Sequence, residues 1–165
     1  MNYLKNSIYL IIILVGSGLF ITSCKTKQDV VKKPVKKKEF YMDGKMKFYN
    51  GSNLTEAIDF AKKVNKPLFI EFYTEWCLPC KLLSEEVFVN ANFAKTFNDN
   101  FINYKLDADA QHGADMKFLY NVSSVPTLLF VDHRGRELER IVGTIHQTTL
   151  LNSAHHVIQN WESAD

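Results

Sequence analysis

The chain has 165 residues, of which 46% are hydrophobic and 13% aromatic, and its formal net charge is +2 at pH 7. The charge is uneven: residues 1–39 carry eight Lys against two acidic residues (net +6), whereas residues 40–165 carry 12 Lys and Arg against 16 Asp and Glu (net −4). The acidic part is long enough for one domain with one core, and its charge argues against nucleic acid or another polyanion as a partner.

The first 23 residues are typical of a bacterial export signal. Lys5 supplies a positive charge, and an apolar run of 14 residues follows from Ile8 to Ile21. This run suits a signal peptide but is shorter than the roughly 20 residues of a membrane-spanning helix. It ends at Ile21-Thr22-Ser23-Cys24, which resembles the lipobox of bacterial lipoproteins. The resemblance implies a signal peptide over residues 1–23 and lipidation of Cys24; the alternative is an uncleaved signal anchor with an unmodified Cys24.

A strongly basic segment follows Cys24. Residues 25–39 contain seven Lys against two acidic residues and little apolar material, which predicts a disordered tether. The lysines would keep the tether close to anionic lipid headgroups. We therefore expect a lipid-anchored protein of the bacterial cell envelope that faces the periplasm. The residue after the lipidated cysteine is Lys25 and not an acidic residue. By resemblance to the sorting signals of enteric bacteria, this favours the outer membrane.

Residues 40–165 predict one domain in which strands and helices alternate. Asn53, with Glu56 three residues later, is typical of a helix N-terminus. The run Leu68–Tyr73 predicts a central strand buried on both faces, because only Glu71 interrupts its apolar character. The predicted strands cover residues 46–49, 68–73, 101–107, 127–131 and 137–142, and the predicted helices cover residues 54–64, 80–97 (interrupted near 90–92), 109–120 and 147–161.

The order of these elements predicts the fold class. An alternating β-α-β-α-β-α start, followed by a hairpin and a closing helix, indicates a mixed central sheet with helices on both faces. We therefore expect an α/β protein, a three-layer α/β/α sandwich. The phenylalanines with helical-to-strand spacing, namely Phe88, Phe93, Phe97 and Phe101, predict core positions.

Two cysteines, Cys77 and Cys80, directly follow the predicted central strand and begin a helix. A structural zinc ion needs four ligands, but the domain has no second cysteine pair. Its five histidines also lack ligand spacing, so we predict no metal and no other cofactor. These histidines are His112, His133, His146, His155 and His156.

The position of the cysteine pair at a helix N-terminus predicts thiol-disulfide exchange. The free N–H groups and the helix dipole there stabilise a thiolate by about 1 kcal/mol. We therefore expect Cys77 to be the exposed nucleophile and Cys80, one turn further on, to resolve the mixed disulfide. The alternative is a purely structural disulfide, which is the commoner use of cysteine pairs in exported proteins.

The residues around the pair resemble a known family. Residues 72–81 (FYTEWCLPCK) closely resemble the active site of thioredoxin, with Trp76 before the first cysteine and Pro79 inside the pair. Residues 75–109 resemble most the branch that includes the C-terminal domains of transmembrane disulfide reductases and related thioredoxin-like bacterial lipoproteins. The resemblance implies a thioredoxin fold, a redox-active Cys77–Cys80 disulfide, and contact of substrate with Trp76 and Pro79.

Three further positions match the part of the family pattern that binds substrate. Val125-Pro126 stands where the family places a cis-proline beside the cysteines, which implies that the Val125 backbone meets an incoming peptide; the alternative is a trans turn proline. Gly143 matches a glycine that leaves room for a bound substrate chain; the alternative is a glycine at the start of a helix.

Two charged residues match the family's proton-transfer positions. Glu71, six residues before Cys77, matches a buried acid that is more often aspartate. Burial is expected to raise the pKa of this carboxyl, which suits an acceptor for the proton of Cys80, directly or through a water. Lys105, in the next predicted strand, matches the lysine that accompanies the acid; the alternative is a strand residue with a solvated tip.

The residue between the cysteines indicates the direction of electron flow. Strong oxidants and isomerases of this fold usually have a histidine before the second cysteine, whereas Pro79 offers no N–H to the thiolate of Cys77. We therefore expect a monomeric disulfide reductase that acts on exported proteins and receives electrons from a membrane or periplasmic donor. The alternatives are an oxidase or isomerase of the same fold and a non-catalytic binding lipoprotein.

Overall fold

The computed structural model describes residues 39–143 and 146–162. The predicted signal peptide, Cys24 and nearly all of the tether lie outside these residues. Within them, every helix is too short or too polar to cross a membrane.

Six strands form one mixed sheet in the order β1-β2-β4-β3-β5-β6. The strands β2, β4 and β3 are parallel, and β1, β5 and β6 pair antiparallel with their neighbours. Strands β3 and β5 are buried along almost their whole length, as their apolar sequences predict. The strand bounds are β1 Phe40–Asp43, β2 Met46–Tyr49, β3 Leu68–Tyr73, β4 Ile102–Asp107, β5 Thr127–Val131 and β6 Glu137–Val142.

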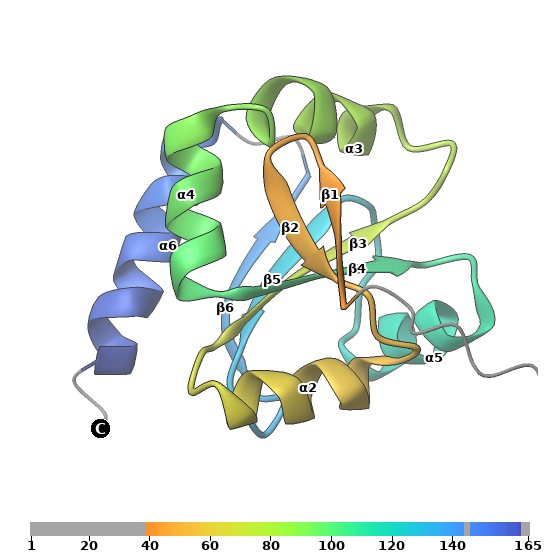
Figure 1. Ribbon diagram of the computed structural model, residues 1–165. Coiled ribbons are helices and arrows are strands. Elements are labelled where there is room, and N and C mark those ends of the chain that lie inside the picture. The colour runs from red at the N-terminus through yellow and green to blue at the C-terminus, as the bar shows by residue number, and fades with distance from the viewer. Residues whose placement is uncertain (1–38, 144–145, 163–165) are drawn as a thin grey trace, which may run out of the picture. The chain divides into compact units, whose positions relative to one another are not determined.

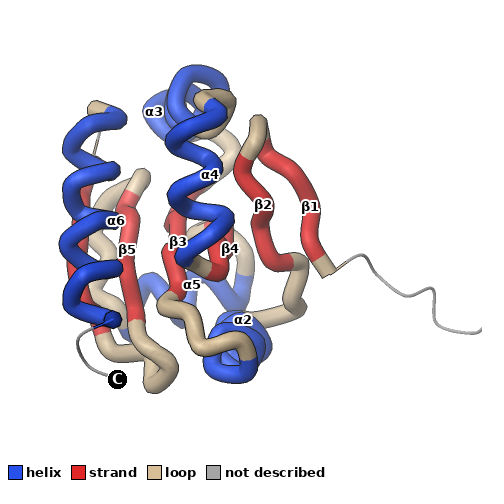
Figure 2. Tube along the Cα trace, turned by 60° about the vertical axis from the view of Figure 1, so that its left-hand side comes forward, coloured by secondary structure: helices blue, strands red, loops and turns tan. Residues whose placement is uncertain are grey.

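Helices cover both faces of the sheet (Figures 1 and 2), which confirms the predicted three-layer α/β/α sandwich. On one face α4 and α6 pack against β2, β3 and β5, and on the other face lie α2 and α5. The helical bounds are α2 Leu54–Lys63, α3 Leu78–Leu82, the π-helical turn η1 Leu83–Val87, α4 Ala91–Asn100, α5 Gln111–Leu119 and α6 Gln147–Glu162.

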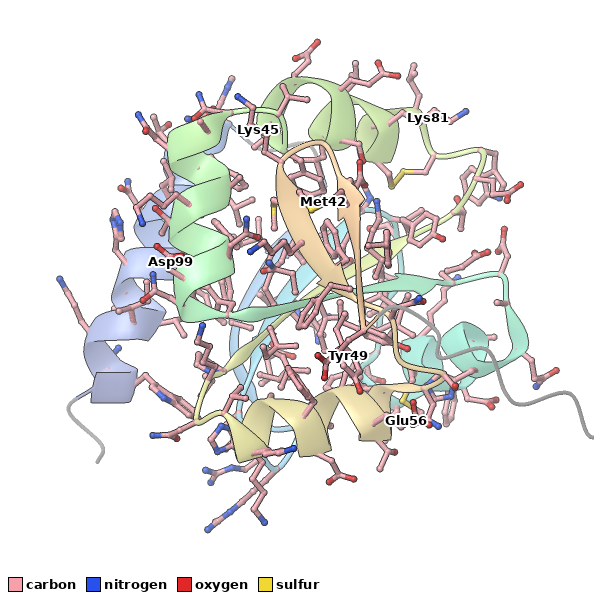
Figure 3. The ribbon with its side chains drawn as sticks, in the orientation of Figure 1. Met42, Lys45, Tyr49, Glu56, Lys81 and Asp99 are labelled. Carbon is pink, nitrogen blue, oxygen red and sulfur yellow. A yellow bond between two sulfur atoms is a disulfide. The ribbon has the colours of Figure 1, made fainter. Side chains whose placement is uncertain are left out.

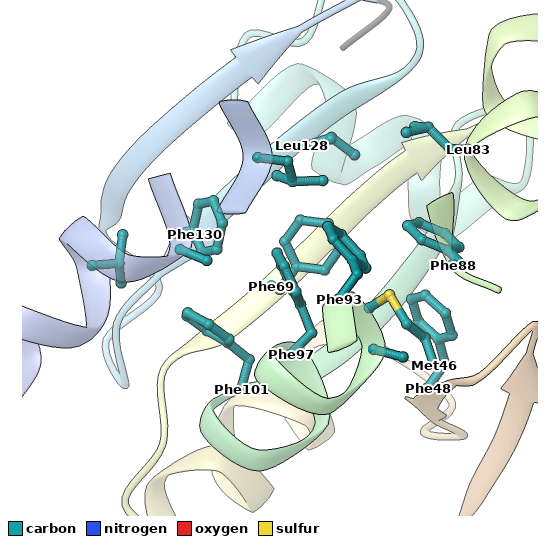
Figure 4. Packing of buried hydrophobic residues seen from close by; sticks show 14 residues of the cluster. Met46, Phe48, Phe69, Leu83, Phe88, Phe93, Phe97, Phe101, Leu128 and Phe130 are labelled. Atoms are coloured by element: carbon teal, nitrogen blue, oxygen red, sulfur yellow. The ribbon is translucent and has the colours of Figure 1, made fainter. Parts of the chain in front are cut away.

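The core beneath α4 and α6 is built mainly from phenylalanine (Figure 4). The four phenylalanines predicted to be core residues are all buried. Phe97 is at the centre of the group, with its ring 4.5 Å from that of Phe93 and 4.8 Å from that of Phe69 between centroids.

The structure differs from the sequence-based prediction at two elements. The strand β1 was not predicted; it forms a hairpin with β2 through a turn at Gly44. The long predicted helix starts at Leu78 instead of Cys80, and η1 separates its first turn from α4. Its predicted interruption is present, because Asn90 caps α4 by accepting hydrogen bonds from the N–H groups of Asn92 and Phe93.

Candidate active site

The cysteine pair lies in the turn from β3 to α3, at the carboxyl-terminal end of the central strands. Cys77 is the N-cap of α3 and Cys80 lies in its first turn. The two sulfur atoms form a disulfide, visible as the yellow bond beside the start of α3 in Figure 3. The N–H of Cys80 donates to Cys77 Sγ at 3.2 Å. One of the free amides of the helix end is therefore directed at the Cys77 sulfur.

Neither cysteine is exposed in this oxidised state. Cys77 is 2% exposed and Cys80 is 4% exposed. The expected exposure of Cys77 concerns the reduced nucleophile and stays a prediction. The N–H of Cys77 donates to the carbonyl of Thr74 at 3.2 Å, which closes the turn that leads into α3. The two cysteines therefore differ in position and not in exposure, since only Cys77 is the N-cap of α3.

Two large side chains flank the disulfide in solvent. Trp76 is 72% exposed, and Leu78 on the other side of Cys77 is also exposed. The indole Nε1 of Trp76 donates to Asp109 Oδ2 at 2.7 Å, which ties the cysteine turn to the loop after β4. Asp109 was not recognised from the sequence as a site residue. Asp109 could have been found from its place just after the predicted strand 101–107, which lies parallel to β3.

Glu71 and Lys105 occupy adjacent strands in direct register, on the sheet face that carries α3 and η1. Glu71 is fully buried, and Lys105 Nζ lies 3.1 Å from its Oε2. Burial raises the pKa of Glu71 from 4.5 to about 7, although the neighbouring Lys105 ammonium acts in the opposite direction. The predicted pairing of these two residues is therefore present, and the pKa of the carboxyl lies much closer to neutral pH than that of an exposed glutamate.

The ammonium of Lys105 has a second carboxylate partner. Nζ lies 2.6 Å from Asp43 Oδ2, and the same oxygen accepts a hydrogen bond from Ser84 Oγ at 2.8 Å. Burial would lower the pKa of Lys105, but Glu71 and Asp43 outweigh it and raise the pKa. Neither Asp43 nor Ser84 was predicted. Ser84 could have been found as the residue one helical turn after Cys80.

A small cavity joins Cys80 to Lys105 and Ser84. Its volume is about 190 Å³, and it is lined by residues of the cysteine turn, of α3 and η1, and of β4. The lining includes Cys80, Ser84 and Lys105. The resolving cysteine and the ammonium beside Glu71 therefore share one solvent-connected space.

Two backbone features lie at the end of the sheet where the cysteine pair is found. The Val125–Pro126 peptide bond is cis, as the sequence predicts. Gly143 has φ +87° and donates its N–H to the carbonyl of Pro126 at 2.9 Å. The positive φ alone favours glycine there, so the role of Gly143 in making room for substrate stays a prediction. Since Phe72 pairs with Thr127, the loop before β5 lies beside the end of β3.

Among the residues that the structure describes, no three His, Cys, Asp or Glu side chains converge as metal ligands would. The predicted site residues other than Cys24 all lie in the described domain.

Comparison with known proteins gives one consistent result. Residues 54–158 match the family model of the thioredoxin-like domain. The chain is 32% identical over 95 residues to the chloroplastic M-type thioredoxin of Spinacia oleracea, covering 58% of this chain and 49% of that protein. It is 31% identical over 106 residues to the thiol:disulfide interchange protein DsbD of Citrobacter koseri, covering 62% of this chain and 18% of that protein. This chain thus spans about half the length of the first relative and a small part of the second.

A solved structure gives the same fold. The solution structure of a candidate disulphide-isomerase from Bacteroides thetaiotaomicron superposes with a TM-score of 0.60 at 36% identity. The match covers 68% of this chain and 91% of that chain.

Proposed function

Since this chain belongs to the thioredoxin-like domain family, we propose that it is a thiol-disulfide oxidoreductase whose working group is the Cys77–Cys80 pair. The observation that carries the proposal is the disulfide itself, formed across the first turn of a helix that directs an amide at Cys77 Sγ. A structural bridge would be expected to join distant segments, since the stabilisation grows with the length of the closed loop. This bridge closes a loop of only four residues.

The exchange takes place in two steps. In the reduced protein the Cys77 thiolate attacks one sulfur of a substrate disulfide; a mixed disulfide forms and the first substrate thiolate leaves. The Cys80 thiolate then attacks Cys77 Sγ, which breaks the mixed disulfide and releases the second substrate thiolate. The substrate gains two electrons and, after protonation, two protons, and the protein ends with the Cys77–Cys80 disulfide. A dithiol donor restores it by the reverse sequence.

In the second step Glu71 takes the proton of Cys80. The pKa of about 7 lets this carboxyl accept a proton at neutral pH and release it again. The cavity lined by Cys80 and Lys105 supplies the route between the thiol and the charged group. Lys105 stabilises the ionised form of Glu71 from 3.1 Å.

We propose that the direction is reductive. Pro79 has no N–H, so Cys77 Sγ has one backbone hydrogen bond in the described structure, from Cys80. A weakly stabilised thiolate makes the dithiol a better electron donor. Equilibration with glutathione or dithiothreitol buffers, followed by thiol alkylation, measures the potential. A value near the roughly −270 mV of thioredoxin supports reduction, and one near the roughly −120 mV of a dedicated oxidant contradicts it.

Trapping tests the function and identifies substrates. In a Cys80→Ser variant the second step is blocked, so mixed disulfides through Cys77 should accumulate and separate from the protein on reduction. The matched control is Cys77→Ser, which keeps the same count of thiols but lacks the nucleophile. Equal trapping by both variants, or none by either, would contradict the proposal.

We also propose that the domain works outside the cytoplasm on a lipid anchor at Cys24. The support is the sequence alone: an apolar run ending in a lipobox-like segment and a basic tether. Exported proteins with disulfides are then the substrates, and a membrane or periplasmic dithiol is the donor. Metabolic labelling with a radioactive fatty acid should mark the wild type and leave a Cys24→Ala variant unlabelled.

A further inference from the structure

The turn of the N-terminal hairpin is fixed to the helical segment that follows the cysteines. The N–H of Lys45 donates to the carbonyl of Phe88 at 2.8 Å. Gly44 approaches the same peptide so closely that a Cβ atom would lie 2.8 Å from it, and its φ of +58° also favours glycine. Asp43, the last residue of β1, is therefore held at a defined place next to this segment.

From this place Asp43 reaches Lys105 and Ser84, which line the same cavity as Cys80. Its Oδ2 accepts from Ser84 Oγ at 2.8 Å and lies 2.6 Å from Lys105 Nζ. On the other side the same ammonium lies 3.1 Å from Glu71 Oε2. One positive charge is thus shared between two carboxylates, one fully buried and one at the edge of the site.

Three aromatic rings keep the ammonium where it is. Nζ lies 4.8 Å from the ring centroid of Tyr73, 5.4 Å from that of Phe48 and 5.7 Å from that of Phe88. Contacts of this kind attract a cation and are stronger where water is excluded. If Asp43 lost its charge, Lys105 would remain in place and act on Glu71 alone.

We propose that Asp43 is a positioning residue of the redox site that acts through Lys105: its carboxylate shares the ammonium and thereby weakens the interaction of Lys105 with Glu71. The inference rests on the proposed function, in which Glu71 accepts the proton of Cys80. Asp43 lies outside the family match, which begins at residue 54. Through the hairpin, a residue outside this match thus reaches the charged group of the redox site.

Other titratable groups lie around this ion pair. From β1 and β3 the hydroxyls of two tyrosines interact with Glu71 electrostatically, and charged residues line the cavity mouth. The tyrosines are Tyr41 and Tyr73, and the charged residues are Glu75, Lys81 and Glu85.

The test is the titration of the Glu71 carboxyl by ¹³C NMR in the oxidised full chain in detergent. Asp43→Asn keeps an oxygen acceptor for Ser84 and Lys105 but removes the negative charge. We expect the midpoint for Glu71 to fall by roughly one pH unit, since a nearby charge moves a carboxyl by about that much. An unchanged midpoint overturns the proposal. The matched control is Asp99→Asn, an exposed acid of α4 paired with Lys95, which should leave the midpoint unchanged.

A second variant covers the case in which Asp43→Asn does not fold. Ser84→Ala keeps every charge but removes the hydrogen bond that Ser84 donates to Asp43, together with the longer one that Ser84 Oγ accepts from Lys105 Nζ at 3.4 Å. The midpoint should therefore fall by a smaller amount. No change in Ser84→Ala would then overturn the proposal.

A kinetic readout separates positioning from a structural role. The pH dependence of single-turnover reduction of a peptide disulfide should shift to lower pH together with the Glu71 midpoint. An equal loss of rate at every pH would show a structural role only and overturn the proposal. The NMR titration needs no exchange activity, so its failure is distinct from failure of the proposed function, which the trapping experiment tests.

Discussion

Glu71 is a fully buried carboxyl group beside a single ammonium, and its protonation is therefore linked to folding. Burial raises the pKa from 4.5 to about 7, and Lys105 offsets only part of this effect. The folded protein holds the proton more tightly than the unfolded chain does. The stability that this proton contributes is full below about pH 4.5 and is lost as the pH rises through about 7.

The size of this effect can be measured by urea unfolding of the oxidised protein. At about 1.4 kcal/mol per pKa unit, we expect Glu71 to lower the free energy of unfolding by about 3 kcal/mol between about pH 4.5 and pH 8. Glu71→Gln should remove this loss, because the amide does not ionise. The raised pKa of Lys105 keeps that residue charged over the whole window. Identical pH dependence in the wild type and the variant would contradict the prediction.

Trp76 is the largest exposed side chain beside the disulfide, and its orientation depends on one hydrogen bond. Without the Asp109 carboxylate the indole would be free to rotate, and ordering such a side chain on binding costs about 0.5–1.5 kcal/mol. We therefore expect Asp109→Ala to raise the KM for a peptide disulfide by roughly two- to tenfold. The maximal single-turnover rate and the melting temperature should change little. A fall in maximal rate at unchanged KM would argue against an orienting role.

At the scale of elements, the phenylalanine core fixes α4 against the sheet. Phe97 is fully buried, and its ring packs against those of Phe69, Phe93, Phe101 and Phe130. Phe97→Ala should lower the free energy of unfolding by about 3–5 kcal/mol, because it removes a large side chain and leaves a cavity. Phe118→Ala on α5 is the matched control, since that ring is 87% exposed and should change stability by less than about 0.5 kcal/mol. Similar losses in both variants would show that the core is not the cause.

Much of the sheet and the centre of the site could be predicted from sequence because each rests on local signals. The run at Leu68–Tyr73 marks a strand buried on both faces, and the cysteines directly after it mark a helix N-terminus. The β1 hairpin was missed although Asp43-Gly44 is a strong hairpin signal, because β1 has only four residues, two of them exposed. Missing this hairpin also meant missing Asp43.

The remaining site residues depend on contacts between distant segments. The pairs Asp43–Lys105 and Trp76–Asp109 are separated by 62 and 33 residues, and neither spacing marks a helix face or a turn.

For the whole molecule, folding and redox state are linked through the position of the two cysteines. The fold holds their Cα atoms 5.3 Å apart, whereas in the unfolded chain closing the loop costs conformational entropy. The disulfide should therefore form more readily in the folded protein than in the unfolded chain. By the thermodynamic cycle, the oxidised protein must then be the more stable form.

This linkage yields a prediction about the direction of electron flow. For a loop of four residues the chain-entropy relation gives about 2 kcal/mol. We therefore expect the free energy of unfolding in urea to be about 2 kcal/mol higher for the oxidised protein than for the reduced one. The same difference makes the folded disulfide harder to reduce than that of the unfolded chain by about 40 mV, which favours electron donation by the folded dithiol. A variant with both cysteines changed to serine should show no effect of added reductant. A reduced form more stable than the oxidised one would be the property of an oxidant, and would contradict both this prediction and the proposed reductive direction.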